Sequence, residues 1–145
     1  MKPYFLYLLA GLAITLSCSC KTQQSTAAAG DGITGKQWRL TELYGQPVTV
    51  TGNSKIPGIL LNATDKRITG NGGCNTFNGS YDIKDHSRIS FSQMASTQMA
   101  CIDMTTETKL LQALQTADNY TISGNQLSLN KARMAPLARF EAVAP

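Results

Sequence analysis

The sequence has a single histidine, and this shortage narrows the chemistry that the protein can perform. An enzyme that pairs a nucleophile with a general base needs a group that titrates near neutral pH, and histidine is the usual one. His86 lies in the polar stretch Lys84-Asp85-His86-Ser87, which is typical of a solvated turn between strands. We therefore expect that this protein is not an enzyme and has no catalytic residues.

Cofactor fingerprints and a clustered basic surface are also missing. The glycine-rich stretch from Gly70 to Gly79 is not followed by the lysine that a phosphate-binding loop requires. The formal net charge is +4, but Lys66-Arg67 is the only adjacent basic pair, whereas nucleic-acid-binding proteins gather their basic residues on one face. These shortages predict no cofactor and no nucleic-acid partner.

Four sulfur-containing side chains form a candidate metal site. Met94, Met99, Cys101 and Met104 lie close together in the sequence, and soft sulfur ligands of this kind suit Cu(I). Methionine, however, is more often an adaptable filler of hydrophobic cores, and a disulfide-bonded Cys101 could not bind a metal. We therefore expect no metal site.

No apolar run is long enough to span a membrane as a helix. The uncharged run from Tyr4 to Leu16 is shorter than the roughly 18 to 20 residues that such a helix needs, but it fits the hydrophobic region of a secretory signal. It ends in Leu16-Ser17-Cys18, which resembles the lipobox of bacterial lipoproteins. We predict a diacylglyceryl group on Cys18, with Cys20 as the alternative site and a plain signal peptide as the simpler interpretation.

The N-terminus therefore divides the chain into three parts. Residues 1–17 are expected to be the lipoprotein signal peptide, residues 18–32 a lipid-anchored flexible tether, and residues 33–145 one small folded domain. A diacylglyceryl anchor holds a protein firmly at a membrane without a transmembrane helix. We expect a monomer in the cell envelope, attached to the inner or outer membrane and facing the periplasm or the cell surface.

Two cysteines remain inside the folded part, and their number predicts a bridge. Cys74 and Cys101 form an even pair in a chain that carries an export signal, which favours a disulfide. The alternative is two buried thiols, because a sequence cannot supply the Cα separation that a bridge needs.

Strand patterns dominate the folded part, and one segment resembles a helix. Short runs alternate apolar and polar residues, Ser80–Ile83 and Arg88–Ser92 most clearly, and Gly124-Asn125 separates two runs as in a hairpin. The dipeptides Asn71-Gly72 and Asn78-Gly79 suit left-handed turn positions and predict a turn on either side of Cys74. After Asp103 the leucines at 110, 111 and 114 form one apolar stripe. The fold class is therefore mainly β (α+β), an antiparallel meander that is strongly curved or closed, with one helix across an opening.

Two blocks of residues resemble one known family. The first is Gly70-Asn71-Gly72-Gly73-Cys74-Asn75-Thr76-Phe77-Asn78-Gly79-Ser80-Tyr81, and the second is Thr97-Gln98-Met99-Ala100-Cys101. Together they resemble the META domain, the group that includes the HslJ-like heat-shock lipoproteins. The resemblance implies a lipocalin-like β-barrel meander with one helix and no established catalytic activity. It also implies an envelope protein associated with the stress response.

The sequence leaves two functions open. The first is a non-catalytic binding or stress-protective module of the cell envelope that contacts an unidentified envelope protein or peptide. The alternative is a structural or inhibitory partner of another envelope protein, acting through a rigid Gly-rich loop. A ligand-binding barrel needs an internal cavity, whereas an inhibitor needs an exposed loop and no cavity. The candidate partner-binding residues in either case are Gly72, Gly73, Asn75, Phe77 and Asn78.

Overall fold

The strands of this protein alternate buried and exposed side chains, as the sequence predicts. The computed structural model describes residues 32–50, 55–85 and 87–143. In β5 (Thr76–Lys84), Phe77, Gly79 and Tyr81 are buried and the residues between them are exposed. Successive side chains of a strand point to opposite faces, so one face of each strand joins the core. The other elements are β1 (Gln37–Leu43), β2 (Gln46–Pro47), β3 (Gly58–Asn62), β4 (Arg67–Asn71), β6 (Arg88–Phe91), β7 (Ala95–Ser96), α1 (Thr105–Thr116), β8 (Asn119–Ser123), β9 (Gln126–Asn130) and β10 (Ala138–Ala142).

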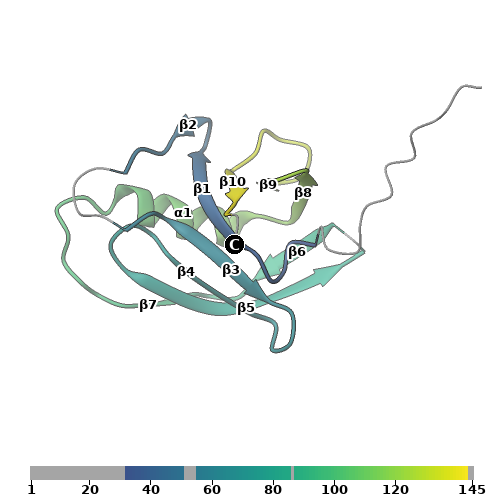
Figure 1. The fold of residues 1–145 in the computed structure, drawn as a ribbon, viewed down its shortest axis with the longest axis horizontal. Helices are drawn as coiled ribbons and strands as arrows, with labels where there is room; N and C mark the ends of the chain where they lie inside the picture. The colour runs from purple at the N-terminus through teal and green to yellow at the C-terminus, as the bar shows by residue number, and fades with distance from the viewer. Residues whose placement is uncertain (1–31, 51–54, 86, 144–145) are drawn as a thin grey trace, which may run out of the picture.

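Eight of these strands form a closed antiparallel barrel (Figure 1). The strand order is β10-β9-β8-β6-β5-β4-β3-β1, and β10 pairs with β1 to complete the ring. The two short strands β2 and β7 pair with β1 and β5 at the margin. Strands that follow one another in the sequence are therefore neighbours in the sheet. The predicted closed meander with one helix is confirmed.

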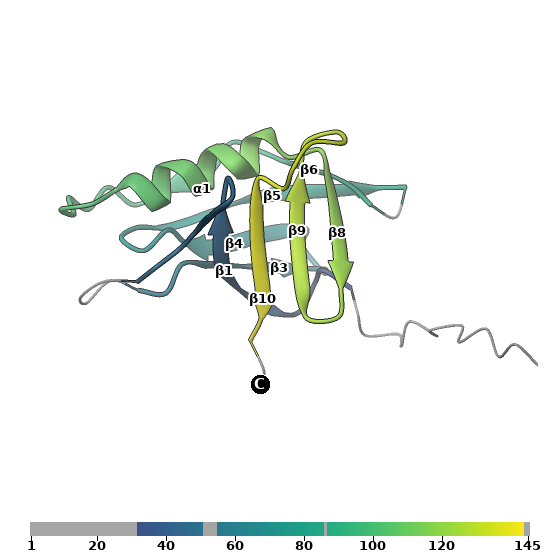
Figure 2. The same ribbon diagram turned by 90° about the horizontal axis from the view of Figure 1, so that it is seen from above.

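The helix lies across one mouth of the barrel (Figure 2). It contacts both β1 and β6, which are well separated in the strand order. Leu110, Ala113 and Leu114 are fully buried, so the apolar stripe seen in the sequence faces the core. At the helix start, the carboxylate of Asp103 accepts a hydrogen bond from the backbone N–H of Thr105 at 2.8 Å, and this bond lowers the pKa of Asp103.

Side chains fill the inside of the barrel. The indole of Trp38 is completely buried, and its Nε1–H donates to the carbonyl of Ile33 at 2.8 Å. This bond fixes the segment before β1 against the core, and the N–H of Gly35 adds a bond to the carbonyl of Leu61 at 2.9 Å. The largest side chains that pack with Trp38 in the core are Ile59, Leu61, Ile68, Phe77, Leu127, Leu129 and Phe140.

One local prediction was wrong. Asn78-Gly79 suggests a tight turn in the sequence, because this dipeptide suits left-handed backbone positions. In the structure both residues lie inside the continuous strand β5. A Cβ on Gly79 would stand 2.6 Å from Sδ of Met94 and 3.0 Å from Oγ of Ser92. The missing side chain therefore serves the close approach of the segment after β6.

The pairing between β6 and β8 is the shortest strand pairing in the barrel. A single register pair, Arg88 with Asn119, joins these strands, whereas β8 and β9 share five. Two backbone hydrogen bonds cross this seam, from Ile89 N–H to Asp118 at 3.1 Å and from Tyr120 N–H to Ser87 at 2.8 Å. The chain makes the connection through α1, which ends beside the seam.

Protonation of Asp118, a residue just after α1, should lower the free energy of unfolding at acidic pH. Its carboxylate accepts hydrogen bonds from the N–H of Ala132 at 2.8 Å and from Asn119 at 2.7 Å, and these bonds lower its pKa. The unfolded chain then binds more protons than the folded one at mildly acidic pH, so the stabilisation is present above the ordinary aspartate pKa of about 3.9 and is lost as pH falls through the lower folded pKa. Denaturant titrations at several pH values should show a shallower acid loss for Asp118→Asn. Equal slopes for variant and wild type would contradict this assignment.

Several predictions fall outside the described residues. They concern the signal peptide, the tether, the lipid sites Cys18 and Cys20, and the turn residue His86. In the part of the chain that the structure does describe, no helix is long and apolar enough to cross a membrane.

Candidate functional site

A disulfide joins the two cysteine blocks at the mouth that carries the helix. Cys74 and Cys101 are bonded, with their Cα atoms 6.2 Å apart, so the predicted bridge is confirmed and the alternative of two free thiols is not. Cys74 belongs to the Gly-rich loop, residues 72–75, which connects β4 to β5. Cys101 belongs to the cysteine segment, residues 97–104, which leads from β7 into α1. The bridge therefore ties a hairpin loop to the entry of the helix.

Asn75 makes the same connection through hydrogen bonds. Its side chain is almost fully buried, with 1 % of its surface exposed. Its carbonyl oxygen accepts from Thr97 Oγ1 at 2.8 Å and from the N–H of Met99 at 2.7 Å, and its amide nitrogen donates to the carbonyl of Met99 at 3.3 Å. A buried carboxamide that satisfies backbone groups in this way fixes the position of an otherwise irregular segment.

Glu107 fixes the other side of the Gly-rich loop. Its carboxylate is buried in the first turn of α1 and accepts the backbone N–H of Asn75 at 2.7 Å. A negative charge is favourable here because the N-terminus of a helix carries a partial positive charge. Gly72 packs directly on this side chain, and its N–H donates to the carbonyl of Asn75 at 2.9 Å.

Alanine at position 72 should therefore destabilise the protein. A Cβ there would stand 2.5 Å from Cγ, 2.6 Å from Cβ and 2.8 Å from Cα of Glu107, and the last of these is backbone that cannot move aside. Overpacking of this kind usually costs about 1 to 3 kcal/mol. Chemical denaturation of Gly72→Ala should show this loss, whereas Gly32→Ala should cost little because the backbone of Gly32 is not left-handed and the atoms nearest to the added Cβ, both of Thr34, would lie 3.8 and 3.9 Å away. Equal losses in the two variants would contradict the packing argument.

The segments around this loop expose apolar side chains. Val50, Ile56 and Met99 have roughly half of their surface exposed, at 43 %, 57 % and 59 %, and Ile102 is fully exposed. We call these four residues the apolar rim. Val50 lines a small pocket together with Gly72 and Gly73, Ile56 follows Lys55, whose N–H bonds to Gly73, and Met99 bonds to Asn75, so these three border the Gly-rich loop. Ile102 follows the disulfide-bonded Cys101. Large apolar side chains exposed near one another are typical of surfaces that contact another molecule.

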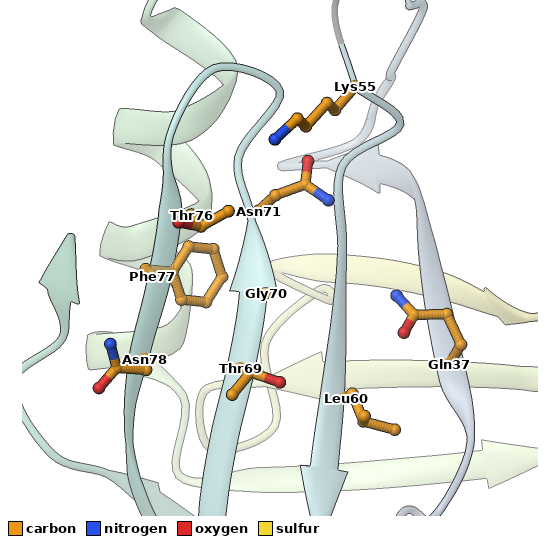
Figure 3. A pocket seen from close by; sticks show the side chains of 9 residues that line it. All are labelled: Gln37, Lys55, Leu60, Thr69, Gly70, Asn71, Thr76, Phe77 and Asn78. Carbon is orange, nitrogen blue, oxygen red and sulfur yellow. The ribbon is translucent and has the colours of Figure 1, made fainter. Parts of the chain in front are cut away.

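A shallow hollow lies beside the loop on the outer face of β1, β3, β4 and β5 (Figure 3). Its volume is about 460 Å³. Gln37, Leu60, Thr69 and Asn78 are paired across these four strands in one row, so their side chains share a face. Lys55 closes the hollow near the Gly-rich loop, where its side chain points toward Asn71.

The predicted partner-binding residues fall into three environments. Gly72 and Asn75 are buried and Gly73 is partly buried, so they shape the Gly-rich loop rather than present side chains on its surface. Phe77 points into the core, with 2 % of its surface exposed. Asn78 points outward into the hollow.

Sequence reasoning missed the apolar rim and most of the hollow. The period-two alternation of β4 and β5 places Thr69, Asn71, Thr76 and Asn78 on one face, and this signal is readable from the sequence. The addition of Gln37 depends on the register between β1 and β3, which no local pattern specifies. Among the described residues, no group of three or more histidine, cysteine or acidic side chains is placed to hold a metal ion.

Comparisons with known proteins agree on the fold. A family model described as the META domain matches residues 31–144. An NMR structure of a protein from Burkholderia xenovorans aligns with a TM-score of 0.61 at 22 % identity, covering 78 % of this chain and 85 % of that one. A second NMR structure aligns with a TM-score of 0.58 at 21 % identity, covering 75 % and 90 %. A search of curated proteins gives no match.

Proposed function

This chain belongs to the META-domain family, and on that premise we propose that it is a non-catalytic binding or stress-protective module of the cell envelope. In this proposal the apolar rim and the Gly-rich loop form the surface that contacts a protein or peptide partner. The observation that carries this proposal is the fixation of that loop. The disulfide and the buried side chain of Asn75 hold it to the cysteine segment, and the carboxylate of Glu107 holds it to α1. A surface fixed before binding loses little conformational entropy on association.

The filled barrel favours surface contact over an enclosed ligand. The large side chains of the core, among them Trp38, Phe77 and Phe140, occupy the space that a lipocalin-like carrier would need for its ligand. This packing also supports the alternative, in which the protein is a structural or inhibitory partner that acts through the rigid loop. Both versions of the proposal use the same surface, so one experiment locates it for both.

We further propose that a lipid on Cys18 holds the protein at the inner or outer membrane, facing the periplasm or the cell surface. The support is the short uncharged run that ends in Leu16-Ser17-Cys18. The N–H of Gly35 bonds to the carbonyl of Leu61 near the end of β3, whereas Gly58 at the start of β3 pairs with Asn71 beside the Gly-rich loop, so the described chain enters the barrel at the end away from that loop. A tether that joins there leaves the loop turned toward a partner. Mass spectrometry of the mature N-terminus should find the acyl groups on Cys18. An unmodified terminus, or lipid on Cys20, would overturn this assignment.

The partner surface is tested by photo-cross-linking in the native envelope. A photoreactive amino acid replaces Ile102 in the full-length protein, and the matched control replaces Gln126, an exposed residue of β9. We expect a discrete adduct from position 102 and none from position 126. The adduct should weaken when Cys101→Ser frees the cysteine segment. An adduct at 126 alone, or none at 102, would contradict the proposal.

A further inference from the structure

The hollow on the outer face of β1, β3, β4 and β5 offers hydrogen-bond donors that have no acceptor in the part of the chain that the structure describes. Asn78 Oδ1 accepts a hydrogen bond from Arg67 Nη2 at 2.6 Å, and Asn71 Oδ1 accepts the N–H of Gly73 at 3.1 Å. Both donors can only donate, so these bonds fix which way each carboxamide is turned. The oxygen of each carboxamide therefore already accepts a hydrogen bond, and within residues 32–50, 55–85 and 87–143 neither NH₂ group has an acceptor. Both residues line the hollow, and Figure 3 shows the NH₂ group of Asn71 directed toward β3.

The remaining lining adds more donors and no acidic group. The ammonium of Lys55 has no ion-pair partner within residues 32–50, 55–85 and 87–143. Gln37 and the hydroxyls of Thr69 and Thr76 each both donate and accept. Among the described residues, no carboxylate lines the hollow. The hollow therefore suits a ligand rich in acceptor oxygens that carries negative charge.

The donors are spread out rather than concentrated. Gln37, Leu60, Thr69 and Asn78 lie in successive strands, so the row extends over three inter-strand steps of about 4.8 Å each. A compact anion such as phosphate is usually held by several donors that converge on one point. A ligand that fits this row has acceptors distributed along its length. Leu60 gives it one apolar patch to pack on, as the C–H face of a sugar ring requires.

An added peptide strand does not fit this place. Peptides that extend a sheet pair with the unpaired backbone of an edge strand. Here β1 is paired with β3 and β10, β3 with β1 and β4, β4 with β3 and β5, and the start of β5 with β4 and β7. The backbone groups beneath the hollow are already used, so recognition must come from the side chains.

We propose that this hollow binds an acidic oligosaccharide, a chain of sugars that carry carboxylates. The NH₂ groups of Asn71 and Asn78 donate hydrogen bonds to sugar oxygens. Gln37 and the threonine hydroxyls form hydrogen bonds with sugar hydroxyls, and the ammonium of Lys55 forms an ion pair with a carboxylate. The site borders the Gly-rich loop but does not depend on a protein partner there. The proposal therefore stands or fails separately from the proposed function.

The test uses trigalacturonic acid as the probe and its methyl ester as the uncharged control. NMR spectra of the ¹⁵N-labelled protein, purified in detergent as the cell produces it, report the side-chain amides directly. We expect the acid to shift the NH₂ signals of Asn71 and Asn78 but not that of Gln126. The ester should bind about tenfold more weakly because it lacks the charge that Lys55 meets.

Charge reversal separates this site from general attraction to a basic protein. Lys55→Glu should weaken binding of the acid by at least about tenfold, whereas Lys84→Glu, an exposed lysine of β5, should leave it unchanged. The backbone N–H of Lys55 bonds to Gly73 and is retained in the variant, so the fold should persist. Equal binding of acid and ester, equal effects of the two variants, equally tight binding of triglutamate or inorganic phosphate, or no shift at all would each overturn the proposal.

Discussion

Cys101→Ser is expected to lower the free energy of unfolding by about 3 to 4 kcal/mol. The bridge to Cys74 spans 27 positions of the sequence, and the chain-entropy model assigns a loss of this size to opening such a loop in the unfolded state. Cys101 itself is exposed, so the serine should create neither a clash nor a cavity. Denaturant unfolding of the oxidised wild type and of the variant measures the difference.

The double variant Cys74→Ser/Cys101→Ser is the control for this prediction. Both substitutions remove the same link, so the double variant should be little worse than either single one. Losses that simply add would mean that the two side chains stabilise the fold separately. Quantitative thiol labelling of the unfolded, unreduced protein from its native envelope should find no free thiol at either position.

Asn75→Ala is expected to cost about 3 kcal/mol, although it removes only one small polar side chain. Three hydrogen bonds to oxygen and nitrogen atoms and a weaker one to Sδ of Met104 are lost, and the N–H of Met99 is left without its acceptor. Each net hydrogen bond contributes about 1 kcal/mol, and an unsatisfied buried group adds a further penalty of about 1 to 3 kcal/mol. Chemical denaturation should show this loss, while Asn78→Ala, an exposed position of the same strand, should cost less than about 1 kcal/mol.

The stability losses of Asn75→Ala and Cys101→Ser should also be coupled. Asn75 and the disulfide both hold the cysteine segment against the Gly-rich loop, so once one is removed the other has less structure to stabilise. The combined loss in Asn75→Ala/Cys101→Ser should therefore be smaller than the sum of the single losses. Additive losses would mean that the two links act on independent parts of the structure.

Much of the barrel could be predicted from local patterns. Period-two alternation found β6 and the hairpin of β8 and β9, and the leucine stripe found the helix. The prediction failed at Asn78-Gly79 because a turn-forming dipeptide and a tightly packed strand place the same demand on sequence, which is the lack of a side chain. The close neighbours Ser92 and Met94, which lie 13 and 15 positions after Gly79 in the sequence, decide between them.

The candidate site was less predictable because its links are distant in sequence. The even number of cysteines in the folded part, together with the expected export of the chain, was enough to predict the disulfide. The bond between Glu107 and the backbone of Asn75 joins residues 32 positions apart, and nothing local to either residue indicates it. The outer hollow likewise depends on the register of four strands, which is settled by the packing of the whole barrel.

The short pairing between β6 and β8 is the place where the barrel can open at the lowest cost in free energy. Releasing it breaks the two backbone hydrogen bonds between these strands and leaves the pairing of β10 with β1 untouched. The barrel would then become an open curved sheet in which β9 stays paired with β10, and β8 with β9. Amide hydrogens at the seam, those of Ile89 and Tyr120, should consequently exchange with solvent through this small opening long before those of β1, which exchange only when the whole domain unfolds.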